Sequence, residues 1–482
     1  MNKCMSGDPD TRIAGCTALI KTRQDTNENL SIIYNNRGNA YNRKGDHDHA
    51  IQDFSEAIRL NPNYGYYRNR GIDYYEKGDY ERAIQDFNEA IHLSPNDTFA
   101  YVSRGDAYSN KRDYDRAIQD FNEAIRLNPN DSDNYRELGI ACYGKGDYDR
   151  AIQDYNLAIH LNSNDASAFY RRGDAFSGRG LDYDHQYNHR QAIQNYTEAI
   201  QDYDEAIFLN PANASAEFGR GLAYDRRGLE NDNRDDYNRA IQDLGEAIRL
   251  KPKDAGAYTY RGMAFNQKGD YDQAIQDLNE ATRLNPKDTL AYIGRGASYL
   301  RKGDFDRAMQ DFEEVVRLNP KDTFAYEGRG EVHFFQSNLA AAMSDFETAI
   351  SDAPSSRMAV FPAAMLHVAM KRQGRDDSRQ LAQVAAAADL SKWPGPVLQL
   401  DMGKMTAGDV MAAAANPGDD NQKWHVCQAN YFIGEDALLK NQRTTALTRL
   451  KAARDTCPKW DLDYLAALVE LKRLGASAAS PQ

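Results

Sequence analysis

Hydrophobic and polar residues follow one another along this chain with the spacing of paired amphipathic helices. In residues 98–131, "TFAYVSRGDAYSNKRDYDRAIQDFNEAIRLNPND", Tyr101, Gly105 and Tyr108 recur at three- and four-residue steps, which places them on one helical face. A second set around Phe121 repeats this spacing after the polar turn "NKRDYD". The closing "NPND" ends the second helix, because proline suits a first turn and not a helix interior. The segment therefore predicts a helical hairpin.

The same hairpin pattern returns along most of the chain with a period of about 34 residues. Each copy has one glycine in its first helix, and most copies are followed by one proline. The glycines are Gly38, Gly71, Gly105, Gly139, Gly173, Gly221, Gly262, Gly296 and Gly330. The prolines are Pro62, Pro95, Pro129, Pro211, Pro252, Pro286, Pro320 and Pro354, with Ser163 in the remaining copy. A mid-helix glycine costs ~1 kcal/mol against alanine, so its recurrence indicates that a neighbouring helix approaches closely there.

This pattern resembles the tetratricopeptide repeat (TPR) family, in which glycine, aromatic, alanine and proline positions recur at fixed offsets. The resemblance implies an all-α fold, a right-handed superhelical solenoid of helix-turn-helix hairpins with a concave groove lined by the first helices. Members of the family mostly bind peptides, helices or whole proteins and perform no chemistry. A two-helix unit cannot bury both of its faces alone, so stacking similar units builds one continuous core.

The repeats predict five parts of the chain. Residues 1–30 form an N-terminal capping helix, and residues 31–354 form nine TPR units. Residues 355–426 are a divergent helical segment, residues 427–475 a C-terminal TPR-like cap, and residues 476–482 a disordered tail. Insertions fall near 178–190, 199–206 and 226–239; we interpret the first and third as longer turns between helices and the second as an extension of the second helix.

Arginine precedes the repeat glycine in every unit except the one with Leu138, and an aspartate recurs in step within "AIQD". Two columns of opposite charge predict a structural ladder of ion pairs between the helices of each hairpin, since a partly buried arginine is normally paired. Its first members are Arg37, Arg70 and Arg104 with Asp53, Asp86 and Asp120. The alternative is an arginine stripe that captures carboxylates or phosphates.

Positions that differ between the repeats are the candidates for partner binding, because the shared positions build the scaffold. On the face of the first helices expected to line the groove, aromatic residues would anchor a peptide and polar residues would set its register. These candidates are Asn35, Asn39, Arg68, Tyr75, Asp106, Arg136, Tyr143, Tyr170, Asp174, Phe218, Met263, Glu327 and Phe334. The paired Lys and Asn of chaperone-tail-binding members is not seen. Drift on a non-binding face is the alternative.

The insertions also carry acidic residues and histidines, but no known metal-ligand spacing. The residues are Asp182, Asp184, His185, His189, Asp232, Asp235 and Asp236. We assign no metal and no cofactor, and interpret the insertions as a polar, tyrosine-rich contact ridge. No catalytic residues are assigned, because neither a phosphate-binding glycine loop nor a nucleophile–base arrangement is readable.

Composition narrows the classes of function further. Of the 482 residues, 27% are charged and the net charge is −13, which argues against nucleic acid as the partner. No stretch is apolar and long enough for a membrane span. We expect a non-catalytic scaffold that binds a protein or peptide. The alternatives are an envelope-associated structural or assembly factor and a non-catalytic subunit of an enzyme complex. Oligomeric state is not predicted.

The five cysteines give information about the cellular compartment of the protein. Cys427 begins the first helix of the last hairpin and Cys457 ends its second helix, so a disulfide between these neighbouring ends is expected. Cys4 can fold back onto Cys16, and Cys142 is expected to be a buried free thiol. The chain ends resemble those of proteobacterial, rhizobia-like TPR proteins, which are often exported, and this favours a periplasmic or secreted protein. The start "MNKCMSGDPD" has no signal sequence, which a removed signal peptide or a cytoplasmic protein would each explain.

Overall fold

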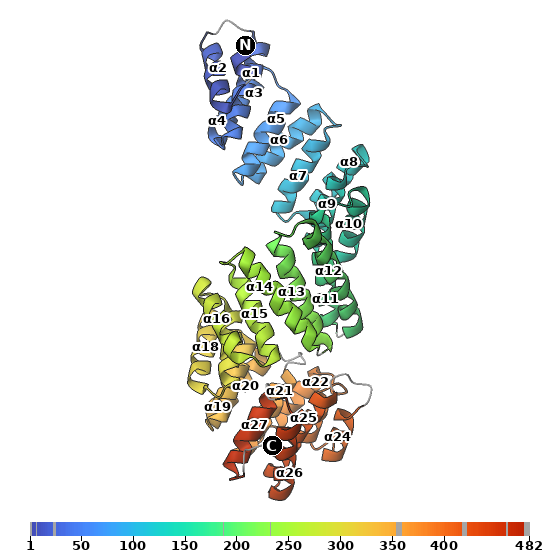
Figure 1. The fold of residues 1–482 in the computed structure, drawn as a ribbon, viewed down its shortest axis with the longest axis vertical. Helices are drawn as coiled ribbons and strands as arrows, with labels where there is room; N and C mark the ends of the chain where they lie inside the picture. Colours follow the sequence, from blue (N-terminus) through green and yellow to red (C-terminus); the bar gives the residue numbers. More distant parts are fainter. Residues whose placement is uncertain are drawn as a thin grey trace. The chain divides into compact units, whose positions relative to one another are not determined.

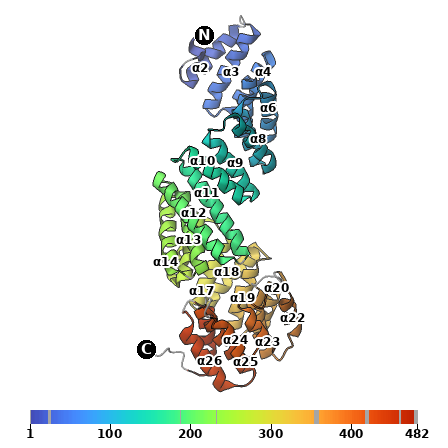
Figure 2. The same ribbon diagram turned by 90° about the vertical axis from the view of Figure 1, so that its right-hand side faces the viewer.

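The computed structural model describes residues 2–5, 7–22, 26–186, 188–231, 233–352, 359–416, 422–458 and 461–476. Regular structure over these residues is entirely helical, and successive helices pair as antiparallel hairpins (Figures 1 and 2). The all-α hairpin repeat predicted from the sequence is therefore confirmed. The chain divides into two compact units, Met1–Ala216 and Glu217–Gln482.

Unit 1 consists of two N-terminal helices followed by five hairpins. The N-terminal helices are α1 (Asn2–Met5) and α2 (Pro9–Thr22). The hairpins are α3 (Asn27–Arg43) with α4 (His47–Leu60), α5 (Tyr64–Glu76) with α6 (Tyr80–Leu93), α7 (Thr98–Asn110) with α8 (Tyr114–Leu127), α9 (Ser132–Lys145) with α10 (Tyr148–Leu161), and α11 (Ala166–His185) with α12 (His189–Leu209).

Unit 2 continues with four repeat hairpins and a C-terminal group of helices. The hairpins are α13 (Ala214–Asn231) with α14 (Arg234–Leu250), α15 (Ala255–Lys268) with α16 (Tyr271–Leu284), α17 (Thr289–Arg301) with α18 (Phe305–Leu318), and α19 (Thr323–Phe335) with α20 (Leu339–Asp352). The C-terminal helices are α21 (Val360–Arg372), α22 (Ser378–Ala387), α23 (Gly395–Asp401), α24 (Ala407–Ala414), α25 (Gln422–Leu439), α26 (Arg443–Thr456) and α27 (Leu462–Arg473).

Short polar signals in each repeat set where its helices begin and end. Asp113 precedes α8 and its side chain accepts a hydrogen bond from the backbone N–H of Arg116, which satisfies one of the free donors of the first turn. The turn before α10 contains Gly146 at φ 85°, a left-handed conformation that glycine adopts without steric cost. The turn sequence thus fixes the length of both helices of a hairpin.

The repeat glycine gives the aromatic residue of "AIQDF" room to pack. A Cβ added to Gly105 would lie 2.7 Å from Cε1 of Phe121, which is closer than side-chain carbons approach. The same packing recurs for Gly38 with Phe54, Gly71 with Phe87, Gly139 with Tyr155, Gly173 with Tyr203, Gly262 with Leu278 and Gly330 with Phe346. The expectation that helices approach closely at these glycines is confirmed.

The two insertions that we interpreted as longer turns are instead parts of longer helices. Residues 178–185 belong to α11, which is 20 residues long, and α12 extends to 21 residues. Arg179 and Gly180 repeat Arg172 and Gly173 seven residues on, and Gly180 faces Tyr196 as Gly173 faces Tyr203. A heptad closes nearly two helical turns, so adding one to each helix continues the same interface. The 226–239 insertion likewise lengthens α13 and α14.

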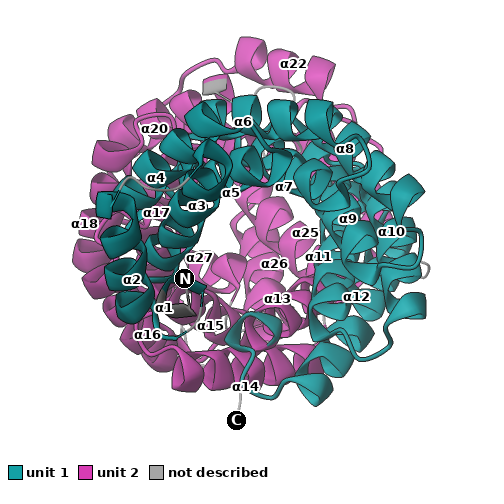
Figure 3. Ribbon diagram, turned by 90° about the horizontal axis from the view of Figure 1, so that it is seen from above, with its two compact units in different colours: residues 1–216 teal, residues 217–482 magenta. Residues whose placement is uncertain are grey.

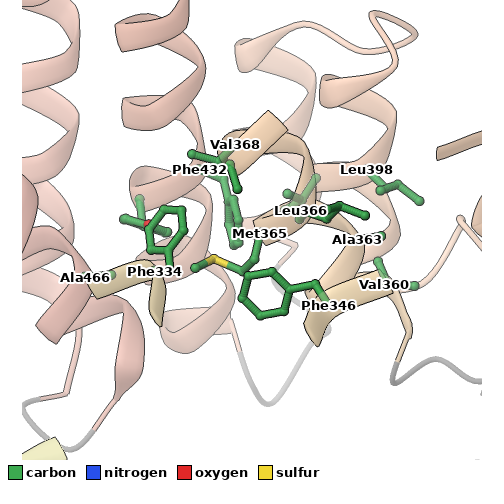
Figure 4. Packing of buried hydrophobic residues seen from close by; sticks show 14 of the residues in the cluster. Phe334, Phe346, Val360, Ala363, Met365, Leu366, Val368, Leu398, Phe432 and Ala466 are labelled. Atoms are coloured by element: carbon green, nitrogen blue, oxygen red, sulfur yellow. The ribbon is translucent and has the colours of Figure 1, made fainter. Parts of the chain in front are cut away.

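The C-terminal helices of unit 2 share one hydrophobic core with the last repeats. Buried residues of α19 and α20, including Phe334 and Phe346, pack with Met365 of α21, Phe432 of α25 and Ala466 of α27 (Figure 4). The predicted end of the repeats at Pro354 and all but the first residue of the predicted tail at 476–482 lie outside the described residues. At the other end of the chain, α1 and α2 together occupy the region predicted as a single capping helix.

Candidate partner-binding face

The two charged columns of the repeats pair within each hairpin. Arg104 of α7 donates from Nε and Nη2 to both carboxylate oxygens of Asp120 in α8, at 2.8 and 2.6 Å. Its Nη1 also donates to Asn88 of the preceding hairpin at 2.6 Å. One arginine therefore links two neighbouring repeats, which is the role expected of a structural ladder.

The same ion pair is present in eight repeat hairpins, with shortest distances of 2.6–2.8 Å. The arginine side chains are 16–24% exposed and the aspartates 6–9%. Because these guanidinium groups are mostly buried and each forms a bidentate ion pair, their role is to stabilise the scaffold. The pairs are Arg37–Asp53, Arg70–Asp86, Arg104–Asp120, Arg172–Asp202, Arg220–Asp243, Arg261–Asp277, Arg295–Asp311 and Arg329–Asp345.

The exception is the hairpin with Leu138. Its buried Asp154 contacts the Cys142 Sγ at 3.6 Å and the Arg150 Nε at 3.9 Å, and has no bidentate arginine. Burial raises the pKa of Asp154 to about 6, with only partial compensation from Arg150. This repeat carries an unmatched buried acid where its neighbours carry an ion pair.

The first helices of the hairpins in unit 1 form its inner face, which we define as the exposed side of α3, α5, α7, α9 and α11 (Figure 3). The second helices α4, α6, α8, α10 and α12 lie on the outer side of the same unit (Figure 3). Most candidate residues of unit 1 are half-buried, and Tyr143 is 36% exposed. The half-buried ones are Asn35, Asn39, Arg68, Tyr75, Asp106, Arg136, Tyr170 and Asp174.

Several of these residues are joined between adjacent repeats. Asn69 Nδ2 donates to Asn35 at 3.0 Å and to Asn39 at 3.3 Å, so the first asparagines form a short ladder. Asn110 donates to the Tyr75 hydroxyl at 2.9 Å, and Arg68 lies 3.2 Å from Asp97. Each of these contacts joins a predicted residue to a polar residue of the next repeat that was not among the candidates.

Acidic groups dominate the electrostatics of the inner face at α7, α9 and α11. Burial and the nearby charge of Glu137 raise the pKa of Asp106 to about 7. Burial also raises the pKa of Asp174 to about 6, although this carboxylate accepts a hydrogen bond from the Tyr203 hydroxyl at 2.8 Å. Arg136 is the nearest cation to Asp106 that lowers its pKa. Carboxyl groups held in this way favour a proton or another positive charge beside them.

Sequence reasoning missed Tyr155, whose buried hydroxyl lies beneath this surface. The side chain extends from α10 beneath Gly139 of α9 and is fully buried. Its hydroxyl has no hydrogen-bond partner among the described residues, and the charges of Arg171, Asp174 and Glu137 act on it. The signal in the sequence was the change from "AIQDF" to "AIQDY", which places a polar atom where other repeats have only a ring.

The candidates in unit 2 are placed differently. Phe218 packs edge-on against Tyr260 with ring centroids 5.8 Å apart, and Met263 contacts the next first helix beside Gly294. Phe334 is only 4% exposed and lies within the C-terminal core, with the Arg372 guanidinium over its ring at 4.9 Å. Phe334 is therefore not available as an anchor for a partner.

Burial also affects two acidic residues of the last repeat. It raises the pKa of Glu327 to about 7, and burial together with the charge of Glu327 raises the pKa of Glu331 well above its usual value. Asp461, beside α27, acts on Glu331 and accepts a hydrogen bond from Trp424 Nε1 at 2.5 Å. The C-terminal helices thus occupy the position that a partner would need on α19.

The residues of the insertions that were considered for metal binding lie at the following places in the structure. Asp236 is ion-paired with Arg227 at 2.7 Å and forms a second rung of the ladder in its lengthened hairpin. Asp182, Asp184 and His185 lie in the last turn of α11, and His189 begins α12. Asp235 lies in the first turn of α14, and Asp232 lies outside the described residues.

Both expected cysteine pairs are joined as disulfides. Cys4 bonds Cys16, and Cys427 bonds Cys457 with Cα atoms 4.8 Å apart. Cys142 is a buried free thiol, and burial raises its pKa to about 12. None of the helices in the described part of the chain is both long and apolar enough to cross a membrane.

Stacked helical hairpins with a polar inner face define a helical-repeat protein. Models of the tetratricopeptide repeat match residues 31–64, 102–166 and 289–322, and a TPR repeat model matches residues 71–112, 192–228 and 262–303. The chain therefore contains tetratricopeptide repeats over these ranges.

Several solved structures are similar to parts of the chain. A TPR protein from Parabacteroides merdae is 21% identical over 57% of this chain and 98% of its own, with a TM-score of 0.43. Yeast Tom70 is 14% identical over 92% of this chain and 96% of its own, with a TM-score of 0.39. YrrB, a TPR protein with an unusual peptide-binding site, is 21% identical over 43% and 96%, with a TM-score of 0.33. No curated protein matches the sequence, so the likeness to rhizobia-like proteins stays an expectation.

Proposed function

We propose that this protein is a non-catalytic scaffold that binds a protein or peptide segment along the inner face of unit 1. The observation that supports this is that the repeated positions and the variable positions have different roles in the structure. The repeated residues are used in packing and in the arginine–aspartate ladder. The variable residues of α3, α5, α7, α9 and α11 remain half-buried or exposed on one continuous face. Such a face suits an extended or helical partner.

Unit 2 supports the same assignment by contrast. Its last repeats already contact a segment of their own chain, because Phe334 of α19 packs in a core with Ala466 of α27 (Figure 4). A first helix that is covered in this way buries its aromatic residue. Tyr143, at the equivalent position of α9, is instead 36% exposed. We infer that the inner face of unit 1 is the one left for a partner.

Site-specific photocrosslinking tests this function in the source organism. A photoreactive phenylalanine replaces Tyr143 on the inner face, and a matched variant replaces Leu157, which is 46% exposed on α10, one of the outer helices of unit 1 (Figure 3). We expect one stoichiometric crosslinked protein from position 143 and none from position 157. Crosslinking from position 157 alone would contradict the proposal.

The two disulfides favour an oxidising compartment, which we propose as periplasmic or extracellular. A thiol count on protein from its native source tests this, by alkylation before and after reduction followed by intact mass. One alkylated thiol before reduction and five afterwards would support it. Five alkylated thiols before reduction, under unfolding conditions, would assign the protein to the cytoplasm.

A further inference from the structure

Three carboxyl groups follow one another across the adjacent helices α7, α9 and α11. Asp106, Glu137 and Asp174 are all half-buried on the inner face of unit 1. The charge of Glu137 raises the pKa of Asp106, and the charges of Glu137 and Asp174 both act on the Tyr155 hydroxyl. They form one acidic patch, which we call the carboxyl row.

The cations beside the carboxyl row are already shared among other acids. Arg136 lies 2.5 Å from Asp133, 2.8 Å from Asp165 and 3.3 Å from Glu137. It therefore has three carboxylate partners before Asp106 is counted. Among the described residues, no ion pair or hydrogen bond engages the Asp106 carboxylate. The row carries more negative charge than its own arginines neutralise.

A buried polar atom without a hydrogen-bond partner among the described residues adjoins the row. It is the Tyr155 hydroxyl, and the side chain that carries it is fully buried. Tyr203 provides the contrast, because its hydroxyl reaches the row from α12 and donates to Asp174 at 2.8 Å. A buried hydroxyl is normally hydrogen-bonded, so an unpartnered one beside an acidic patch indicates a missing ligand group.

We propose that the carboxyl row binds a lysine or arginine side chain of the partner, with the Tyr155 hydroxyl accepting one of its hydrogen bonds. This inference rests on the proposed function and names the chemistry of the bound segment. The ammonium or guanidinium group supplies the positive charge that Asp106 lacks and donors for Glu137, Asp174 and Tyr155. The exposed Tyr143 ring lies on the same helix as Glu137 and suits the aliphatic stem of such a side chain.

A phage-displayed library of random dodecapeptides tests the inference on the full-length protein. Selections are run on the wild type, on the double variant Asp106→Asn, Asp174→Asn, and on Asp115→Asn as the matched control. Asp115 is an exposed carboxylate at the start of α8 that is ion-paired with Lys145. We expect peptides with lysine or arginine at one fixed position from the wild type and the control, and their loss from the double variant.

The outcomes separate the inference from the function on which it rests. Peptides that lack a basic residue but compete for the inner face would overturn the inference and leave the proposed function standing. No enrichment on the wild type over a blank support would overturn both.

A synthetic selected peptide then measures the contribution of Tyr155 by fluorescence polarisation. Tyr155→Phe places in α10 the residue that α8 has as Phe121, so the variant is expected to fold. We expect its Kd for the peptide to rise about tenfold through loss of one charge-assisted hydrogen bond. Replacing the basic residue of the peptide with norleucine, which has no donor, should remove this difference between wild type and variant. A Tyr155→Phe Kd equal to the wild-type value would refute the role of the hydroxyl.

Discussion

The same substitution in two adjacent repeats should have opposite effects on stability. Asp120 and Asp154 occupy equivalent positions, but Asp120 is held by Arg104 whereas Asp154 has Leu138 in place of that arginine. We expect Asp154→Asn to stabilise the hairpin of α9 and α10 near pH 8, and Asp120→Asn to destabilise the hairpin of α7 and α8.

The magnitude at Asp154 follows from its pKa. Burial raises the pKa of this carboxyl group from 3.8 to about 6. The folded state therefore holds the proton more tightly than the unfolded state, and stability falls as the pH rises from about 4 to about 6. Two pKa units correspond to about 3 kcal/mol, which Asp154→Asn should recover above pH 6 and not below pH 4.

Another repeat of the same chain already has asparagine at the position equivalent to Asp154. Asn195 in α12 accepts from Arg179 Nε through its Oδ1 at 2.8 Å and donates from Nδ2 to the Gln191 carbonyl four residues earlier at 2.8 Å. An asparagine at position 154 can make the same intrahelical bond. At position 120 it leaves the Arg104 guanidinium without a charged partner, which costs about 2 kcal/mol.

Native-state hydrogen exchange with mass spectrometry measures both effects locally, which matters because a long repeat protein need not unfold in one step. Opening free energies of α9 and α10 are compared at pH 5 and pH 8 for the wild type and Asp154→Asn, with α7 and α8 followed in Asp120→Asn. Our reasoning fails if Asp154→Asn weakens protection at pH 8, or if its effect is the same at both pH values.

Three further predictions concern packing and the thiol. Gly105→Ala should destabilise by about 1–3 kcal/mol in urea unfolding, because its methyl group meets the aromatic ring beneath it at 2.7 Å. Gly245→Ala, whose methyl has open space up to 3.4 Å, should stabilise by about 1 kcal/mol; equal effects would contradict the packing argument. Phe334→Ala should cost about 3–5 kcal/mol, and the exposed Phe324→Ala almost nothing, by thermal unfolding. Cys142 should react with a thiol reagent only after unfolding, since it is buried with its pKa raised to about 12; rapid labelling of the native protein would refute this.

The repeat and its internal contacts were readable from the sequence because they are local. Gly105, Phe121, Arg104 and Asp120 lie within one 34-residue unit, and their fixed offsets bring them together once two helices pair. The cysteine pairs were readable for the same reason, since the ends of an antiparallel hairpin adjoin. Periodicity determines which residues meet inside a hairpin and between neighbouring hairpins.

Tertiary structure alone decided the features that depend on exact helix length and on distant segments. The insertions look like longer turns, but their heptad spacing continues two helices. Phe334 has the position of a binding residue, yet α21 and α27, which begin 26 and 128 residues later, bury it. The Tyr155 ring packs between α9 and α10 only because Gly139 above it has no side chain. Repeat spacing specifies the contacts within the stack, whereas burial depends on what the rest of the chain places over each face.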